Sequence, residues 1–123
     1  MKQHAQGFLG LVKEAMSRVK EITADEVNAM LSRSEKFALI DVREDNEWVA
    51  GRITGALHLG RGIIERDIEK VIPEKDTPIV LYCGGGYRSA LSADSLQKMG
   101  YTHVLSMAGG WSGWCEKNYS RES

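Results

Sequence analysis

Cysteine is scarce in this sequence of 123 residues, which contains only Cys83 and Cys115. Two cysteines do not make a disulfide framework, and an unpaired reactive thiol is typical of a reducing compartment. The sequence also lacks any apolar run near the roughly 20 residues that a membrane span needs. Lys13, Glu14 and Arg18 interrupt the apolar positions near the N-terminus, which argues against a secretory signal. We therefore expect a cytoplasmic protein that makes no contact with membranes.

An excess of either charge is missing as well. Lysine and arginine contribute 16 residues, and aspartate and glutamate contribute 17, so the formal net charge is −1. Such a balance gives no overall field that recruits nucleic acid, and we expect no nucleic-acid partner. His4 and His103 have no partners at ligand spacing, and His58 lies within an apolar strand, where a core histidine is expected rather than a catalyst. The sequence therefore predicts no metal site and no other cofactor, in a single domain with one core.

The strongest pattern lies between Pro78 and Ser89. The apolar run 79–82 predicts a buried strand, and apolar residues at helical spacing predict a helix from Ser89 onward. Cys83 comes directly after the strand, followed by three glycines. Open α/β sheets bind ligands at the carboxyl ends of their strands. The pattern therefore marks Cys83 as the candidate reactive residue.

The residues after Cys83 favour binding of an anion. Consecutive glycines, Gly84 to Gly86, allow successive N–H groups to face one concavity. The N-terminus of the following helix adds a partial positive charge, and Arg88 adds a full one. In this setting we expect a thiolate at Cys83 near neutral pH, which acts as a nucleophile. The alternative is a structural cysteine before a flexible turn.

The loop Cys83-Gly84-Gly85-Gly86-Tyr87-Arg88, followed by Ser89-Ala90, resembles the active-site loop of the rhodanese (sulfurtransferase) family. Other segments resemble further parts of this family, and the resemblance spans about residues 21–119. These segments are Leu39-Ile40-Asp41-Val42-Arg43-Glu44 with Glu47, Gly51-Arg52-Ile53, Gly55-Ala56-Leu57-His58-Leu59, and Gly109-Gly110-Trp111 with Trp114. The resemblance implies a single-domain sulfurtransferase in which Asp41 and Arg43 brace the active face by ion pairing. The alternative role for these two residues is that of simple turn formers.

The order of the expected elements predicts an α/β fold. Strands are expected at 37–40, 55–59, 79–82 and 103–107, and helices at 8–20, 24–31, 46–49, 63–71, from 89, and around 111–115. This alternation predicts a mainly parallel sheet with helices on both faces. The resemblance adds the expectation of five strands. We divide the chain into an N-terminal amphipathic helical extension, 1–20, and a rhodanese-like domain, 21–123.

The N-terminal helix has an apolar face that includes Leu11, Val12 and Ala15, and this face has two possible uses. It either packs back onto its own domain or forms a dimer contact, so that a monomer and a homodimer both remain open. Its polar face mixes both charge signs, which disfavours a membrane surface. Trp48, Trp111 and Trp114 are expected in the core. Cys115 either packs in the last helix or acts as a resolving thiol.

The loop chemistry and the resemblance together imply sulfur transfer. The Cys83 thiolate attacks a sulfane sulfur, for example the outer sulfur of thiosulfate, and becomes a persulfide. A thiol, cyanide or a thioredoxin-like protein then accepts the sulfur. Backbone donors of Gly84, Gly85, Gly86, Tyr87 and Arg88 surround the persulfide in this scheme. Arg88 either guides the anionic donor or closes the loop through a structural ion pair.

Two other function classes compete with sulfur transfer. A cysteine-based phosphatase or arsenate reductase also uses a cysteine, a donor-lined loop and an arginine, with five residues between the two. Here four residues separate Cys83 from Arg88, and the loop contains no acid to protonate a leaving oxygen. A non-catalytic rhodanese-type binding module is the other alternative. Such modules often lack the cysteine, which this chain retains.

Overall fold

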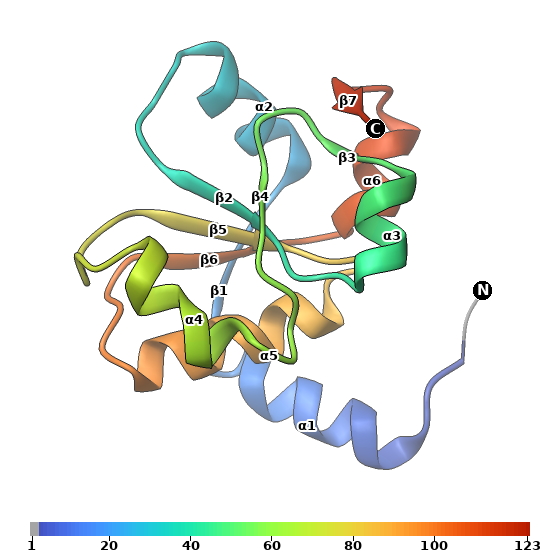
Figure 1. The fold of residues 1–123 in the computed structure, drawn as a ribbon. Helices are drawn as coiled ribbons and strands as arrows, with labels where there is room; N and C mark the ends of the chain where they lie inside the picture. The colour runs from blue at the N-terminus through green and yellow to red at the C-terminus, as the bar shows by residue number, and fades with distance from the viewer. Residues whose placement is uncertain (1–2) are drawn as a thin grey trace.

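The fold is built on one parallel sheet, which the computed structural model shows within the described residues 3–123 (Figure 1). Five strands lie in the order β1-β6-β5-β2-β4, and every pairing between neighbours is parallel. The predicted α/β fold with five strands is therefore confirmed. The sheet strands are β1 (Lys20–Ile22), β2 (Ala38–Asp41), β4 (Leu57–His58), β5 (Ile79–Tyr82) and β6 (Val104–Met107). Strands β3 (Arg52–Ile53) and β7 (Arg121–Glu122) form a separate antiparallel pair.

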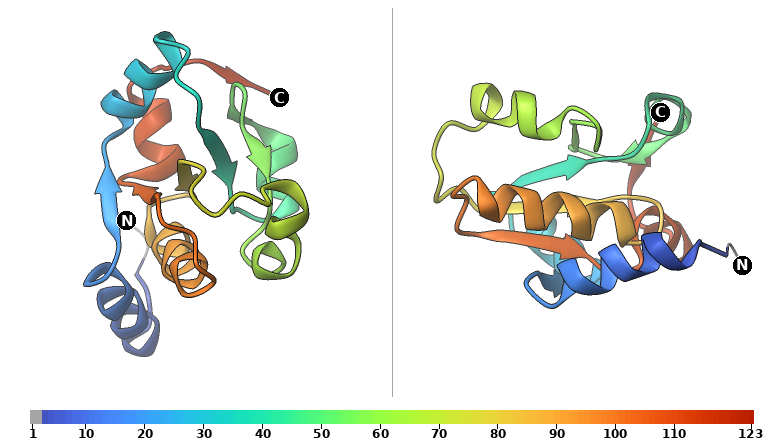
Figure 2. Two further views of the ribbon diagram at one scale, coloured as in Figure 1. Left: turned by 90° about the vertical axis from the view of Figure 1, so that its left-hand side faces the viewer. Right: turned by 90° about the horizontal axis from the view of Figure 1, so that it is seen from below.

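Helices cover both faces of this sheet. Figure 2 shows α1, α4 and α5 on one side, where they lie next to one another in the view from below, and α2 and α6 on the other. The helices are α1 (Gln6–Met16), α2 (Ala24–Ser32), α3 (Asp45–Ala50), α4 (Ile64–Val71), α5 (Tyr87–Lys98) and α6 (Gly110–Glu116). Within residues 3–123, no helix has both the length and the apolar character needed to cross a bilayer.

The central strands are apolar without interruption because both of their faces are buried. In β2, Ile40 packs into the core cluster on the side of α4 and α5. Its neighbour Leu39 packs into the cluster on the side of α2 and α6. In β5, Leu81 packs into the first of these clusters and Val80 into the second. Successive side chains of a strand point to opposite faces, so a sheet between two helical layers needs apolar residues on both of its faces.

The predicted N-terminal helix extends too far towards the C-terminus, and the strand that follows it was not predicted. Helix α1 ends at Met16 rather than at residue 20, and Lys20 to Ile22 form β1 at the edge of the sheet. Residues 20 and 22 align with Leu105 and Met107 of β6. Three residues with two exposed charges give no recognisable strand period, so backbone pairing with β6 determines this element. Residues 1–2 of the predicted extension lie outside the described part.

Helix α1 packs against α5 of the same chain. Val12 and Ala15 are buried, whereas Leu11, which the sequence placed on the apolar face, is 60% exposed. After the helix, Arg18 donates from Nε and Nη2 to the two carboxylate oxygens of Asp94, at 2.9 and 2.8 Å. Apolar packing and this two-point ion pair together hold α1 along α5.

The neighbours Val12 and Leu11 provide a test of this packing. Val12→Asp places a carboxylate at a site that is 3% exposed, and we expect the free energy of unfolding to fall by about 3 kcal/mol. Leu11→Asp changes an exposed position and should stay within about 0.5 kcal/mol of the wild type. Urea unfolding measures both values. Equal losses for the two variants would contradict the packing of α1 on α5, and a lower mass of Leu11→Asp by light scattering would reveal a dimer contact.

Candidate active site

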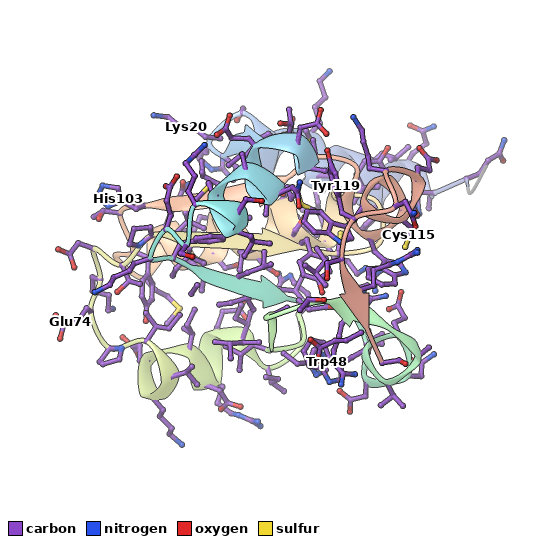
Figure 3. The ribbon with its side chains drawn as sticks, turned by 90° about the horizontal axis from the view of Figure 1, so that it is seen from above. Lys20, Trp48, Glu74, His103, Cys115 and Tyr119 are labelled. Carbon is purple, nitrogen blue, oxygen red and sulfur yellow. The ribbon has the colours of Figure 1, made fainter. Side chains whose placement is uncertain are left out.

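Cys83 lies at the carboxyl end of β5, the middle strand of the sheet. Figure 3 distinguishes the two ends of the sheet: Lys20, Glu74 and His103 lie on the side where strands begin, and Trp48 and Cys115 lie on the opposite side. Cys83 itself is almost fully buried, with 1% of its surface exposed. The buried strand thus fixes the thiol at the carboxyl end of the sheet, where ligands bind in open α/β folds.

The glycine loop turns back so that one of its amides reaches the thiol. Gly86 has a φ of 108°, a conformation that favours glycine, and it is the N-cap of α5. Its N–H donates to Cys83 Sγ at 3.1 Å. The Sγ atom also lies 3.5 Å from Ser89 Oγ, which shares a hydrogen bond of 2.8 Å with Ser106 Oγ. The thiol therefore has a backbone donor on one side and a hydroxyl pair on the other.

The first turn of α6 orients the rest of the loop. Trp111 N donates to the carbonyl of Cys83 at 2.7 Å, and Ser112 N donates to the carbonyl of Gly84 at 3.1 Å. The C=O and N–H groups of a trans peptide point in opposite directions, so the amides of Gly84 and Gly85 point away from α6. Within residues 3–123 neither amide finds an acceptor. These N–H groups are free donors in the loop that directly follows Cys83.

Gly110 makes this close approach of α6 possible. Its φ is 51°, and an added Cβ would overlap the carbonyl of Cys83 and lie 2.9 Å from the carbonyl oxygen of Gly84. A side chain at this position would therefore push α6 and the loop apart. The sequence places Gly110 in a segment of the rhodanese resemblance, but its contact with the loop becomes visible only in the structure.

Arg88 forms an ion pair with Glu47 of α3. Its Nη1 and Nη2 donate to the two carboxylate oxygens at 2.7 and 3.2 Å. Glu47 also accepts the N–H of Glu44 at 3.0 Å. The hydrogen bonds from Arg88 are the main reason that the pKa of Glu47 falls to about 2. Of the two roles left open for Arg88, the geometry therefore favours the ion pair that closes the loop.

Asp41 and Arg43 form a buried pair beside the site. Arg43 Nε lies 3.1 Å from both carboxylate oxygens of Asp41, and Nη2 lies 2.8 Å from Oδ2. Nη2 also donates to the carbonyl of Gly51 at 2.5 Å, and the guanidinium lies over the ring of Trp111 at 4.7 Å. The pair thus links the end of β2 to the end of α3 and to α6. Its bracing role remains a prediction.

A cleft of about 780 Å³ opens in front of the thiol. Its lining combines the loop, the start of α3, the start of α6 and the N-terminal segment. The lining residues are His4, Phe8, Glu44, Asn46, Glu47, Cys83, Gly84, Gly85, Tyr87, Arg88, Trp111 and Ser112. A ligand in this cleft therefore meets residues from four separate segments of the chain.

The tryptophans do not all lie where the sequence placed them. Trp114 is fully buried, as expected. Trp111 is only partly buried and lines the cleft, and Trp48 is partly buried and stacks on His58 at 4.8 Å between ring centroids. Trp48 belongs to α3 and Trp111 to α6, the two helices that begin at the carboxyl end of the sheet, and guanidinium groups lie over both rings.

The contacts of several site residues carried no sequence signal. Glu47 belongs to a segment of the rhodanese resemblance, but nothing in the pattern paired it with Arg88. Ser89 follows the loop directly, and only the structure brings it to Sγ. His4 and Phe8 lie outside the resemblance. Cys115 is a free, partly buried cysteine on α6, and no disulfide joins it to Cys83.

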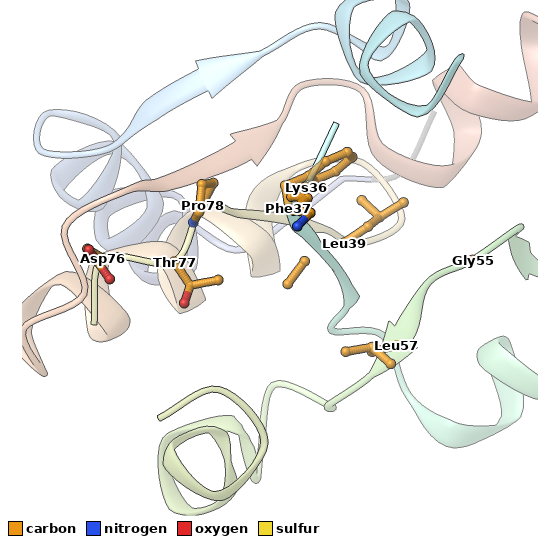
Figure 4. A pocket seen from close by; sticks show the side chains of 9 residues that line it. Lys36, Phe37, Leu39, Gly55, Leu57, Asp76, Thr77 and Pro78 are labelled. Atoms are coloured by element: carbon orange, nitrogen blue, oxygen red, sulfur yellow. The ribbon is translucent and has the colours of Figure 1, made fainter. Parts of the chain in front are cut away.

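A second hollow of about 590 Å³ lies at the opposite end of the sheet (Figure 4). Its lining comes from the starts of β2, β4 and β5, and it contains neither cysteine nor histidine. The lining residues are Lys36, Phe37, Ala38, Leu39, Gly55, Leu57, Asp76, Thr77 and Pro78. The cleft at Cys83 is therefore the candidate active site.

Known proteins resemble this chain in sequence. The family model described as Rhodanese-like domain matches residues 23–117. Thiosulfate sulfurtransferase GlpE of Tolumonas auensis is 30% identical over 99 residues, which cover 80% of this chain and 91% of that protein. The probable adenylyltransferase/sulfurtransferase MoeZ of Mycobacterium tuberculosis is 30% identical over 113 residues. That match covers 89% of this chain but only 29% of the longer protein.

A solved structure matches the whole length of the chain. It belongs to a Rhodopseudomonas palustris protein of unknown function that is described as a possible tyrosine phosphatase. The two chains are 30% identical, and the superposition covers 99% of each with a TM-score of 0.88. The similarity therefore includes the N-terminal helix as well as the sheet.

Gly110 and Gly113 provide a matched test of the contact between α6 and the loop. We expect Gly110→Ala to lower the free energy of unfolding by more than about 3 kcal/mol, because it combines a positive φ with a steric overlap. A Cβ at Gly113 meets nothing within 4 Å. Gly113→Ala should therefore be neutral or stabilise the protein by up to about 1 kcal/mol. Denaturant unfolding gives both values, and a neutral Gly110→Ala would contradict the close approach.

The ion pair of Glu47 predicts a dependence of stability on pH. The pKa of Glu47 is about 2 in the folded protein and near 4.5 in the unfolded chain, so the folded state binds fewer protons between pH 2 and pH 4.5. The contribution of Glu47 to the free energy of unfolding is therefore complete above pH 4.5 and is lost as the pH falls towards 2. For this partly exposed pair we expect Glu47→Gln to cost about 0.5–1 kcal/mol at pH 7. Urea unfolding should show the difference shrinking at pH 2.5, and a constant difference would contradict the pairing.

Proposed function

Because this chain belongs to the rhodanese-like domain family, we propose that it is a sulfurtransferase that carries a sulfane sulfur on Cys83. The main support is the contact between the Gly86 amide and Cys83 Sγ, in a loop where the amides of Gly84 and Gly85 have no acceptor within residues 3–123. A persulfide carries negative charge on its outer sulfur. Backbone donors and a helix N-terminus stabilise such a charge without a general base.

The first half of the reaction loads the sulfur. The Cys83 thiolate attacks the outer sulfur of thiosulfate, and a bond forms between Sγ and that sulfur. The S–S bond of thiosulfate breaks, and sulfite leaves with the electron pair. The charge moves to the outer sulfur of the new persulfide, next to the amides of Gly84 and Gly85.

The second half of the reaction unloads the sulfur. A thiolate or cyanide attacks the outer sulfur, and the electron pair of the S–S bond returns to Cys83 Sγ. An acceptor persulfide or thiocyanate leaves, and the enzyme thiolate is restored. A small thiol, or a cysteine of a thioredoxin-like protein, fits the acceptor role. A thiol that must stay reduced fits the cytoplasm.

Phosphoryl transfer is less well supported by the same geometry. A phosphatase needs its arginine for the oxyanion, whereas Arg88 is bound to Glu47. It also needs an acid that protonates the leaving oxygen near neutral pH. Glu47, with a pKa of about 2, stays ionised and does not fill that role. A purely binding module is disfavoured because the thiol and its donors are all in place.

Intact-protein mass spectrometry after incubation with thiosulfate tests the proposal. We expect the wild type and Cys115→Ala to gain one sulfur atom, and Cys83→Ala to gain none. Cyanide or a reducing thiol should remove the added sulfur. An adduct on Cys83→Ala would contradict the assignment of the nucleophile. Hydrolysis of p-nitrophenyl phosphate, without persulfide from thiosulfate or polysulfide, would support the phosphatase alternative.

A further inference from the structure

Three aromatic rings form one wall of the cleft in front of Cys83. We call His4, Phe8 and Tyr87 the aromatic rim. The ring centroids of His4 and Phe8 lie 5.1 Å apart, those of His4 and Tyr87 5.2 Å, and those of Phe8 and Tyr87 6.1 Å. Such tilted contacts are typical of rings that pack favourably. Tyr87 is 39% exposed, so the rim retains apolar surface for a ligand.

The N-terminal segment, not the family domain, supplies two of these rings. The family model begins to match at residue 23, after His4 and Phe8. Phe8 is held in place because α1 packs on α5 through Val12 and Ala15. Phe8 therefore lies on a fixed helix at the mouth of the cleft, and His4 lies just before that helix.

The charges around the cleft disfavour a doubly charged donor. Its charged lining residues are Glu44, Glu47 and Arg88, which amount to two carboxylates and one guanidinium. The guanidinium is already paired with Glu47. A thiolate at Cys83 adds a further negative charge. A dianion such as thiosulfate is repelled more strongly by this arrangement than a monoanion of similar size.

Resting on the sulfurtransferase function proposed above, we infer that the cleft selects sulfane-sulfur donors with an aromatic leaving group and a single negative charge. Aryl thiosulfonates represent this class. The Cys83 thiolate bonds to the terminal sulfur, the S–S bond of the donor breaks, and the aryl sulfinate leaves with the electron pair. Two monoanions react and two leave, because the persulfide and the sulfinate each carry one charge. The leaving aryl group lies against the aromatic rim.

Two monoanionic donors separate the effect of the ring from that of charge. Benzenethiosulfonate and methanethiosulfonate have the same reacting group, and only the first has an aromatic ring. The rate of thiocyanate formation with cyanide is measured for both, and for thiosulfate, with the intact chain. Each enzymatic rate is divided by the rate of the same donor with a small thiol in solution. We expect kcat/KM for benzenethiosulfonate to exceed that for methanethiosulfonate by about tenfold, with thiosulfate lowest.

Substitutions of Phe8 test whether the rim causes this preference. Phe8→Ala should reduce the ratio of kcat/KM for benzenethiosulfonate to kcat/KM for methanethiosulfonate from about tenfold to about twofold. Phe8→Leu keeps apolar volume without a ring and should also lower the preference for the aryl donor. Because Leu fills most of the same space, this variant tests the ring even if Phe8→Ala fails to fold. Leu11→Ala, at an exposed position of the same helix, should change neither value.

The outcomes distinguish this inference from the function on which it rests. A preference that is absent in the wild type, or unchanged in both Phe8 variants, overturns the role of the rim while sulfur transfer stands. A normalised thiosulfate rate equal to or above the methanethiosulfonate rate overturns the charge argument, because neither donor has a ring. If none of the three donors places sulfur on Cys83, the proposed function itself fails.

Discussion

The carbonyl groups of Cys83 and Gly84 accept hydrogen bonds from the amides of Trp111 and Ser112 in the first turn of α6, and the active loop depends on these two hydrogen bonds. With the carbonyls turned towards α6, the planar trans peptides direct the amides of Gly84 and Gly85 the other way. The loop thereby becomes a set of donors next to the thiol. Gly110 is the residue that lets α6 approach closely enough to form these bonds.

The floor and the mouth of the cleft have opposite electrostatic characters. At the floor, backbone N–H groups and the N-terminus of α5 favour the negative charge of a thiolate or a persulfide. At the mouth, Arg88 is neutralised by Glu47, and Glu44 adds a carboxylate. This division suits chemistry in which the charge rests on the protein-bound sulfur, and the mouth recognises the rest of the donor by other means.

The core strands were predictable because their burial on both faces leaves a continuous apolar run, as in β2 and β5. The edge strand β1 was not, because two of its three residues are exposed charges and its pairing with β6 is purely a matter of backbone contact. The predicted apolar face of α1 contains more residues than the structure buries, because tertiary contacts decide which of them are covered. Helical spacing marks Leu11 as part of that face, but α5 covers Val12 and Ala15 and leaves Leu11 exposed.

The sequence by itself determined the local part of the site: a cysteine at the end of a buried strand, a glycine loop and a helix start, all within the stretch from Ile79 to Ser89. Adjacent residues impose such patterns through backbone freedom and periodicity. Only the tertiary structure decided the partners of that stretch. Glu47 lies 41 residues before Arg88, and the amides of α6 come from the far end of the chain. Their contacts with the loop arise from the order of strands in the sheet, which no local pattern encodes.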